Sequence, residues 1–488
     1  MGEKKCSSYA CNLDTYIDGK CILHCAKKHL YDYKERQFFY DVLSKIVEDN
    51  GSELIVLNYI IFPEHDERYD DSYEKILKTL KSIQFNYCEF HTSNLDLPEI
   101  QCFFQDCKFH KYWTLYDYKV LKNKDDVIYQ CCTFMEDVSV YSAEDKGILF
   151  PIFHESQFDY GCTFKGEVRF DDTKIKKPLF NTNQNSYSST PLFMQSLIFH
   201  NCTFEQPFKL NNYKIDYFSC NHTVFKNKSK FEFKNNEVKE FQLLDTNFKS
   251  LVDCMETEFQ SFKVEKSIFE KFTGFEKCKF GEKEKNSKEA IFQYATFLDF
   301  VNFRDAEFHS GLDLRNANFK ESPNFLDVKV EPNNKVKKTN KETFRMIKHS
   351  FDKVGNTIEA NKYFAYEMNE ERKESRGFKK FMLNLNYLIS DFGQSWIMPL
   401  FWIVVVAGLH YYITDVNHEW LQSFAPTDIK LKTKLLDVIN AFDSFAKNIL
   451  PFKKFLKEGM EFISLLFLII YSTLIYNLII AVKRITKR

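Results

Sequence analysis

The N-terminal segment, residues 1–30, concentrates side chains that bind metal ions. It reads CSSYACNLDTYIDGKCILHCAKKH and places these cysteines and histidines close together: Cys6, Cys11, Cys21, Cys25, His24 and His29. Tetrahedral Zn²⁺ is bound by four cysteines, or by three cysteines and one histidine. We therefore predict a zinc site whose ligands are Cys6, Cys11 and Cys21, completed by Cys25 or His24. Unliganded thiols are the alternative.

The expected role of this metal is structural. A segment of this size cannot bury a core of its own, so metal binding would supply its folding energy. A site closed by four protein ligands leaves no position for an activated water molecule.

Other motifs that would carry chemistry are missing from the sequence. It holds no phosphate-binding glycine loop, no GxSxG and no HExxH. The stretch FPEHDER brings together Glu64, His65 and Asp66, which we interpret as an exposed turn. We expect no enzymatic activity.

The segment that follows the cysteines, residues 31–82, predicts a small α/β cap. YDYKERQFFYDVLSKIVEDNG has apolar residues at helical spacing and stops at Asn50-Gly51. ELIVLNYIIF is typical of a β-strand that ends at Pro63, and DSYEKILKTLKSI returns to helical spacing.

Residues 83–328 carry a repeat that fits neither a helix nor an ordinary strand. The large apolar residues of one stretch advance in steps of 5, 6, 5, 6 and 5: Phe292, Phe297, Phe303, Phe308, Leu314 and Phe319. A small-x-Phe triplet recurs throughout, beginning at Cys88, Cys107, Cys132, Cys162, Cys202, Cys278, Ala295, Ala306 and Ala317. Units this short must stack on their neighbours to bury an apolar face.

This pattern resembles the Phe-centred form of the pentapeptide-repeat family, as in Cys162-Thr163-Phe164. The resemblance implies a mainly β fold, a right-handed quadrilateral parallel β-helix in which small and large residues both point inward. The phenylalanines would then be interior packing, and the repeat cysteines would be small buried residues.

Two further segments predict helices. Residues 338–380 have apolar side chains at a 3/4 spacing, which indicates one amphipathic helix or two that meet at Gly355. They would either cap the β-helix or form a coiled-coil seam. The membrane region, 396–488, contains two apolar runs at about 396–413 and 462–482, each long enough to span a bilayer.

Charges around these runs predict their orientation. Basic residues precede the first run (371–380) and follow the second (483–488), so both termini are expected in the cytoplasm. The connection 414–461 also carries seven lysines, at 430, 432, 434, 447, 453, 454 and 457, and could lie in the interface. The arrangement resembles a group of pentapeptide-repeat proteins anchored in the bacterial inner membrane.

Composition narrows the class of function. The chain of 488 residues has Phe 52 and a net charge of −1, which argues against nucleic acid as a partner and against mimicry of DNA. We expect a membrane-anchored scaffold or protein-binding module whose partners are the lipid bilayer, another protein and further copies of itself. The alternative is an oligomeric membrane effector or channel-like pore regulated by its cytoplasmic β-helix.

Overall fold

The computed structural model divides the chain into two compact units, 1–339 and 340–488. The structure describes these residues: 5–8, 11–27, 32–50, 53–64, 73–97, 99–121, 126–142, 150–159, 161–181, 192–282, 289–330, 339–413, 438 and 460–486.

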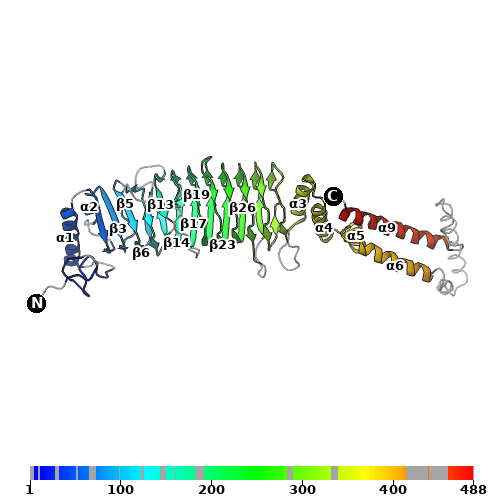
Figure 1. Ribbon diagram of the computed structural model, residues 1–488, viewed down its shortest axis with the longest axis horizontal. Helices are drawn as coiled ribbons and strands as arrows, with labels where there is room; N and C mark the ends of the chain where they lie inside the picture. Colours follow the sequence, from blue (N-terminus) through cyan, green and yellow to red (C-terminus); the bar gives the residue numbers. More distant parts are fainter. Residues whose placement is uncertain are drawn as a thin grey trace. The chain divides into compact units, whose positions relative to one another are not determined.

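The first unit is mainly β, with parallel strands stacked into a solenoid (Figure 1). Two helices precede or interrupt its first coils, α1 (Tyr33–Asn50) and α2 (Tyr73–Leu77). The helix predicted to stop at Asn50 is therefore confirmed.

The run ELIVLNYIIF forms two strands rather than one. β1 (Ile55–Asn58) pairs with β3, and β2 (Ile61–Phe62) pairs with β4 in a different sheet. The backbone turns between them at Tyr59, where φ is 59°. The solenoid thus begins at Ile55, earlier than the expected start at residue 83.

The described strands form four sheets in which all named pairs are parallel. The first contains β1, β3 (Ser82–Asn86), β5 (Gln101–Gln105), β8 (Lys119–Val120), β9 (Val127–Gln130), β13 (Ser156–Asp159) and β16 (Phe180–Asn181). The second contains β2, β4 (Glu89–Phe90), β6 (Lys108–Phe109), β7 (Trp113–Leu115), β10 (Thr133–Phe134), β11 (Val138–Val140), β14 (Thr163–Asp171), β17 (Leu192–His200), β20 (Tyr213–Asn221), β23 (Glu237–Leu244), β26 (Glu258–Glu265), β29 (Lys279–Phe280), β30 (Ala290–Gln293), β33 (Glu307–Phe308), β34 (Leu312–Asp313) and β36 (Lys329–Val330).

The two remaining sheets consist of strands of two residues each. One contains β12 (Ile152–Phe153), β15 (Lys174–Ile175), β18 (Thr203–Phe204), β21 (Val224–Phe225), β24 (Asn247–Phe248), β27 (Ile268–Phe269), β31 (Thr296–Phe297) and β35 (Asn318–Phe319). The other contains β19 (Phe208–Lys209), β22 (Phe231–Glu232), β25 (Val252–Asp253), β28 (Thr273–Gly274) and β32 (Val301–Asn302).

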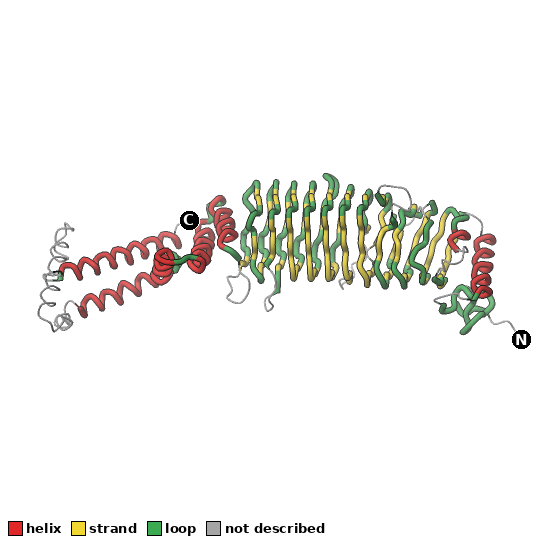
Figure 2. Tube along the Cα trace, turned by 180° about the vertical axis from the view of Figure 1, so that it is seen from behind, coloured by secondary structure: helices red, strands yellow, loops and turns green. Residues whose placement is uncertain are grey.

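Figure 2 shows the coils stacked on one another. Inside these coils, the phenylalanines form ladders. Phe225 lies between Phe204 and Phe248, with ring centroids 4.5 and 4.8 Å apart and interplanar angles of 7° in both pairs. These separations match the spacing of about 4.8 Å between neighbouring strands, so in-register pairing stacks each ring on the equivalent ring of the next coil. The expectation that the phenylalanines pack inside is confirmed. Phe319, in the last strand of its sheet, is only half-buried.

The corners of the coils place residues in the left-handed region. In one series the left-handed residue directly precedes the small buried residue of the repeat: Tyr87, Asp106, Cys131, Asp172, Asn201, His222, Asp245, Lys266 and Tyr294. Asn and Asp tolerate this conformation best, and no β-branched residue adopts it in the described part of the chain.

The small residues of the repeat satisfy backbone carbonyls. The Cys202 thiol donates to the Phe170 carbonyl of the preceding coil at 3.3 Å, and the Thr246 hydroxyl donates to that of Cys220 at 2.9 Å. The repeat cysteines are buried and unpaired by disulfides, and burial raises the pKa of Cys202 to about 12. Packing and a hydrogen bond explain these cysteines.

Outside the coils, charges pair between neighbouring coils. Lys226 lies 2.8 Å from Glu205, and Lys277 lies 3.0 Å from Glu256, in both cases 21 residues away along the chain. Such exposed pairs contribute little stability, but they leave this surface close to neutral.

The second unit begins with a helical hairpin. α3 (Lys341–Lys353) and α4 (Thr357–Glu374) are separated by Gly355, whose φ of 77° breaks the helix. The sequence left open one helix or two for this segment, and the structure has two helices that meet at Gly355. Phe351 stacks on Tyr363 with ring centroids 5.6 Å apart between the two helices.

Three more helices complete the described part of this unit: α5 (Gly377–Ser390), α6 (Ile397–Tyr411) and α9 (Glu461–Thr486). α6 and α9 lie side by side in Figures 1 and 2. Residues 461–484 are long and apolar enough to cross a membrane, whereas Ile397–Tyr411 is a shorter apolar helix. The connection 414–461, with its seven lysines, lies almost wholly outside the described residues.

Candidate functional site

The N-terminal segment folds back on itself around a tight turn. Isolated antiparallel bridges join Lys5 to Asp14 and Ile17 to Lys20. Between the last two residues, Asp18 and Gly19 both have positive φ, 49° and 74°. Asp-Gly is the sequence that favours such a turn, because both central residues must be left-handed. The turn returns the chain so that the Cys21 amide donates to the Cys6 sulfur at 3.3 Å.

Four donor atoms converge at this point. The Nδ1 of His24 lies 3.4 Å from the Cys6 sulfur and 3.3 Å from the Cys21 sulfur. The Cys21 sulfur lies 3.8 Å from that of Cys11. In a tetrahedral zinc site with Zn–S of about 2.3 Å and Zn–N of about 2.0 Å, sulfurs are about 3.8 Å apart and sulfur and nitrogen about 3.5 Å. Cys6, Cys11, Cys21 and His24 therefore form a group that could hold a metal ion.

The other ring nitrogen of His24 determines its tautomer. Nε2 lies 3.1 Å from the carbonyl oxygen of Asn58, at the end of β1. Nε2 must carry the proton to donate this hydrogen bond, so Nδ1 is the ring nitrogen that remains to bind a metal ion among the sulfurs. Histidines that bind metals are commonly oriented by such a bond to a backbone carbonyl.

Titration of these groups follows from their contacts. Burial raises the pKa of Cys6, but hydrogen bonds from Ser8, Cys21 and His24 outweigh it and lower the pKa to about 6. Burial lowers the pKa of His24, but its bonds to Cys21 and Cys6 outweigh burial and raise it. Cys11 differs, because burial raises its pKa to about 12. A cation would favour the thiolate forms that metal binding requires.

Cys25 is not part of the group. Its thiol donates to the Ile22 carbonyl at 3.5 Å and lies 3.9 Å from the Lys27 Nζ. Three of the predicted ligands, Cys6, Cys11 and Cys21, thus come together, and His24 rather than Cys25 stands in the fourth position. The signal for this choice is the two-residue spacing of Cys21-x-x-His24, which a single turn closes: the His24 amide donates to the Cys21 carbonyl at 3.1 Å.

A second group with metal-binding side chains was not identified from the sequence. Glu89, His91 and His110 follow one another on adjacent coils, at β4 and β6. His110 Nε2 lies 2.7 Å from a Glu89 carboxylate oxygen, and the His91 and His110 rings stack 4.3 Å apart. These contacts account for the three side chains without an ion. Of the FPEHDER stretch, Glu64 lies 3.9 Å from Lys111, while His65 and Asp66 lie outside the described residues.

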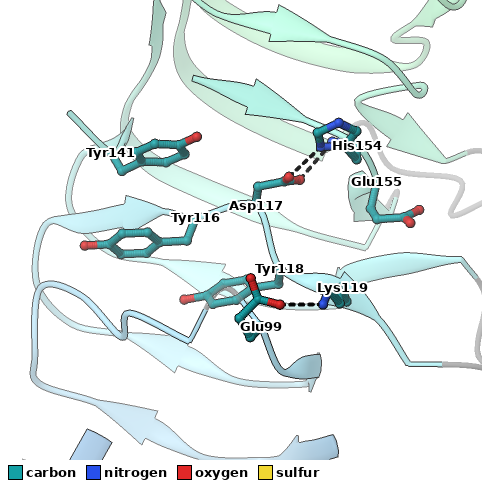
Figure 3. A pocket seen from close by; sticks show the side chains of 8 residues that line it. All are labelled: Glu99, Tyr116, Asp117, Tyr118, Lys119, Tyr141, His154 and Glu155. Atoms are coloured by element: carbon teal, nitrogen blue, oxygen red, sulfur yellow. Dashed lines mark hydrogen bonds and ion pairs between the residues drawn. The ribbon is translucent and has the colours of Figure 1, made fainter. Parts of the chain in front are cut away.

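The solenoid also has an open pocket with a volume of about 510 Å³, shown in Figure 3. Its aromatic wall consists of Tyr116, Tyr118 and Tyr141, and the rings of Tyr116 and Tyr141 stack 5.6 Å apart. Its polar groups are already paired, because Glu99 bonds Lys119 at 2.6 Å and Asp117 bonds His154 at 2.7 Å.

His154 in this pocket has a defined protonation pattern. Its Nε2 accepts from Lys176 at 3.0 Å, so Nδ1 carries the proton donated to Asp117. An Asp-His pair of this kind orients a general base, and no serine, threonine or cysteine is among the described residues that line the pocket. These residues offer an aromatic wall and hydrogen-bonding groups.

No protein-family model, no curated protein and no solved structure matches this chain.

Proposed function

We propose that the chain is a membrane-anchored scaffold of the pentapeptide-repeat type, without catalytic activity, that presents the outer surface of its solenoid to a protein partner. The observation that carries the proposal is the division of the side chains between the inside and the outside of the solenoid. The phenylalanine ladders fill the interior, as at Phe225, and only outward residues remain for recognition. A rigid repeat array is well suited to present an extended binding surface.

We also infer that the solenoid is a right-handed quadrilateral β-helix, in which each coil contributes one side to each of four sheets. In its support, Thr203 pairs with Val224 and Val224 with Asn247, separations of 21 and 23 residues. These lengths fit four sides of five or six residues, as the resemblance implied.

Nucleic acid is not the proposed partner. Outward lysines pair with acidic side chains of adjacent coils, as Lys214 does with Glu237 at 3.0 Å. Such pairing among the described residues argues against a basic patch that binds phosphates and against the dense negative charge that imitates DNA.

The N-terminal group is proposed to be a structural Zn²⁺ site with ligands Cys6, Cys11, Cys21 and His24. Four protein donors close the coordination sphere, so the ion would stabilise the fold of this segment and not activate water. The Ile61 amide donates to the Leu23 carbonyl at 2.9 Å, which joins the segment to β2 at the start of the solenoid. The metal would therefore order the N-terminal end of the scaffold.

We propose that α6 and α9 span the membrane as an antiparallel pair. At 1.5 Å per residue, α9 is about 39 Å long and exceeds the hydrocarbon thickness of about 30 Å, whereas α6 is about 22 Å long and covers about three quarters of it. The end of α9 lies beside the start of α6, because Arg484 donates to the Phe392 carbonyl. Basic residues lie at the end of α9, at Lys483 and Arg484, and at the start of α5, which precedes α6, at Lys379 and Lys380. Their positions support a cytoplasmic location of both termini at the bacterial inner membrane.

Extraction tests the anchoring. Membranes that contain the full chain should retain it through an alkaline carbonate wash, and detergent should release it. Deletion of residues 461–486 should shift the chain toward the soluble fraction. Release of the full chain by carbonate alone would contradict the anchoring.

Capture of a partner tests the scaffold. The tagged full chain, purified in mild detergent, should retain a stoichiometric protein partner, and a chain that lacks residues 1–339 should lose it. Copurification of nothing beyond further copies of this chain would argue against a scaffold. Discrete conductance steps in planar bilayers would favour the oligomeric pore instead.

A further inference from the structure

Helix α5 presents an apolar stripe to its surroundings. Five large side chains on it are exposed by 76, 59, 47, 37 and 49%: Phe378, Phe381, Met382, Leu385 and Leu388. Their spacing of 3, 1, 3 and 3 residues places them on one face of a helix. An exposed apolar stripe of this length calls for a partner, because soluble surfaces rarely leave one uncovered.

The opposite side of α5 is already in contact with the rest of its unit. The Arg372 guanidinium of α4 lies 3.9 Å from the centre of the Tyr387 ring. The Ser390 hydroxyl donates to the side-chain oxygen of Asn477 on α9 at 3.3 Å. These contacts fix the orientation of the helix, and the stripe faces away from them.

The covalent neighbour of α5 indicates what covers the stripe. The helix α6 begins seven residues after α5 ends and exposes equally large apolar side chains, with Ile397 at 60%, Phe401 at 58% and Val404 at 67%. If lipid surrounds α6, it begins within a few residues of α5. A helix that is apolar on one face and polar on the other is the kind that lies in the membrane interface.

Charge at the start of α5 points to the same surroundings. Arg376 and Lys380 are exposed, and Lys379 forms an ion pair with Glu371 of α4. Basic residues next to an apolar face attract anionic headgroups.

We propose that α5 lies in the interface of an anionic leaflet, with its stripe among the acyl chains nearest the surface and Arg376 and Lys380 at the headgroups. This rests on the proposed anchoring by α6 and α9. It adds a second, in-plane element that holds the hairpin of α3 and α4 at the membrane surface.

Photo-cross-linking tests the proposal with the full chain in nanodiscs of phosphatidylcholine and phosphatidylglycerol. A benzophenone amino acid replaces Phe381 on the stripe, Asn384 on the polar face, or Val404 in α6, one at a time. Lipid adducts are quantified by mass spectrometry of the peptides. We expect position 381 to give at least about threefold more adduct than position 384, with adduct at 404 as well.

The outcomes separate the two proposals. Adduct at 404 with a ratio of 381 to 384 below about threefold overturns the interfacial helix and leaves the anchoring intact. Chain-to-chain cross-links at 381 in place of lipid also overturn it and assign the stripe to a second copy. An absence of lipid adduct at 404 contradicts the anchoring itself. With Arg376 and Lys380 both replaced by Gln, the phosphatidylglycerol share of the adduct at 381 should fall, and an unchanged share would overturn the headgroup assignment.

Discussion

The choice between His24 and Cys25 gives the most decisive test of the zinc site. Both residues lie in the same turn, and both side chains can bind zinc. In the structure only His24 points at the three sulfurs, with Nδ1 3.3 Å from Cys21 and 3.4 Å from Cys6. We therefore expect His24→Ala to impair zinc binding and Cys25→Ser to leave it unchanged.

The size of the effect follows from the number of ligands. Structural zinc sites in small domains contribute about 10–16 kcal/mol, or about 2.5–4 kcal/mol for each of four ligands. At 1.4 kcal/mol per factor of ten, removal of His24 should weaken zinc binding by about 10²–10³-fold. Cys25→Ser should change the affinity by less than about threefold, because its sulfur faces the Ile22 carbonyl.

Competition with a chromophoric zinc chelator measures these affinities on the full chain in detergent. Cys21→Ser serves as the positive control, and Co²⁺ substitution reports the ligands, because cobalt-thiolate bonds absorb strongly in the near ultraviolet. If Cys25→Ser lost zinc while His24→Ala kept it, the fourth ligand would be Cys25. If the unsubstituted chain bound no zinc, the metal assignment would be refuted.

Three further predictions concern the fold. Phe225→Ala removes a ring stacked on both sides and should lower the free energy of unfolding by about 3–5 kcal/mol, whereas Phe193→Ala, at a ring 39% exposed, should lower it by about 1 kcal/mol. Hydrogen exchange should accelerate only in adjacent coils, and equal effects of the two substitutions would contradict the ladder. Gly166→Ala should lower the thermal unfolding midpoint, because the new Cβ would lie 2.5–2.6 Å from backbone atoms of the preceding coil; an unchanged midpoint would refute this close approach. Hydrogen bonds from Lys379 and Lys341 lower the pKa of Glu371 to about 2, so this carboxylate stabilises the second unit above its ordinary pKa, 4.5, and the stabilisation is lost as pH falls toward 2. Lys379→Ala should flatten the dependence of helix stability on pH in that window, measured by circular dichroism, and an equally steep dependence would argue against the pair.

Much of the solenoid could be predicted because its signal is local and repeated. The step of five or six residues from Phe292 to Phe308 identifies inward positions without any knowledge of distant contacts, and all four phenylalanines at these positions are buried. The small residue before each phenylalanine likewise follows from one short pattern. Repetition makes the interpretation robust, since a single irregular unit does not change it.

The first coil was not predicted by the same reasoning, because its corner lies inside an apolar run. ELIVLNYIIF has no Gly, Asp or Pro, and its single Asn precedes the residue that turns the backbone, Tyr59 at φ 59°. The equivalent corner of the next coil is Tyr87, and the two rings stack 5.1 Å apart. Neither tyrosine is a residue type that predicts a turn. Pairing with the following coils imposes the corner, and pairing is not visible in one coil alone.

The candidate sites depend on tertiary contacts in the same way. Spacing placed Cys6, Cys11 and Cys21 together, but the carbonyl of Asn58, 34 residues away from His24, orients that imidazole. The pocket was not predicted because Tyr116 and Tyr141 lie on different coils and outside the small-x-Phe triplets.

Helix α5 illustrates how far a sequence pattern reaches. Its apolar spacing from Phe378 to Leu388 is visible in the sequence, yet an amphipathic stripe alone is equally consistent with a buried helix. The contacts of the opposite face show which side points outward: there Ser390 contacts Asn477 of α9, 87 residues further along the chain. With that face occupied, the stripe is left exposed among the described residues of its unit. Under the proposed anchoring, the adjacent apolar helix would bring lipid next to it. The periodicity establishes that one face is apolar, and the distant contact establishes that this face points outward.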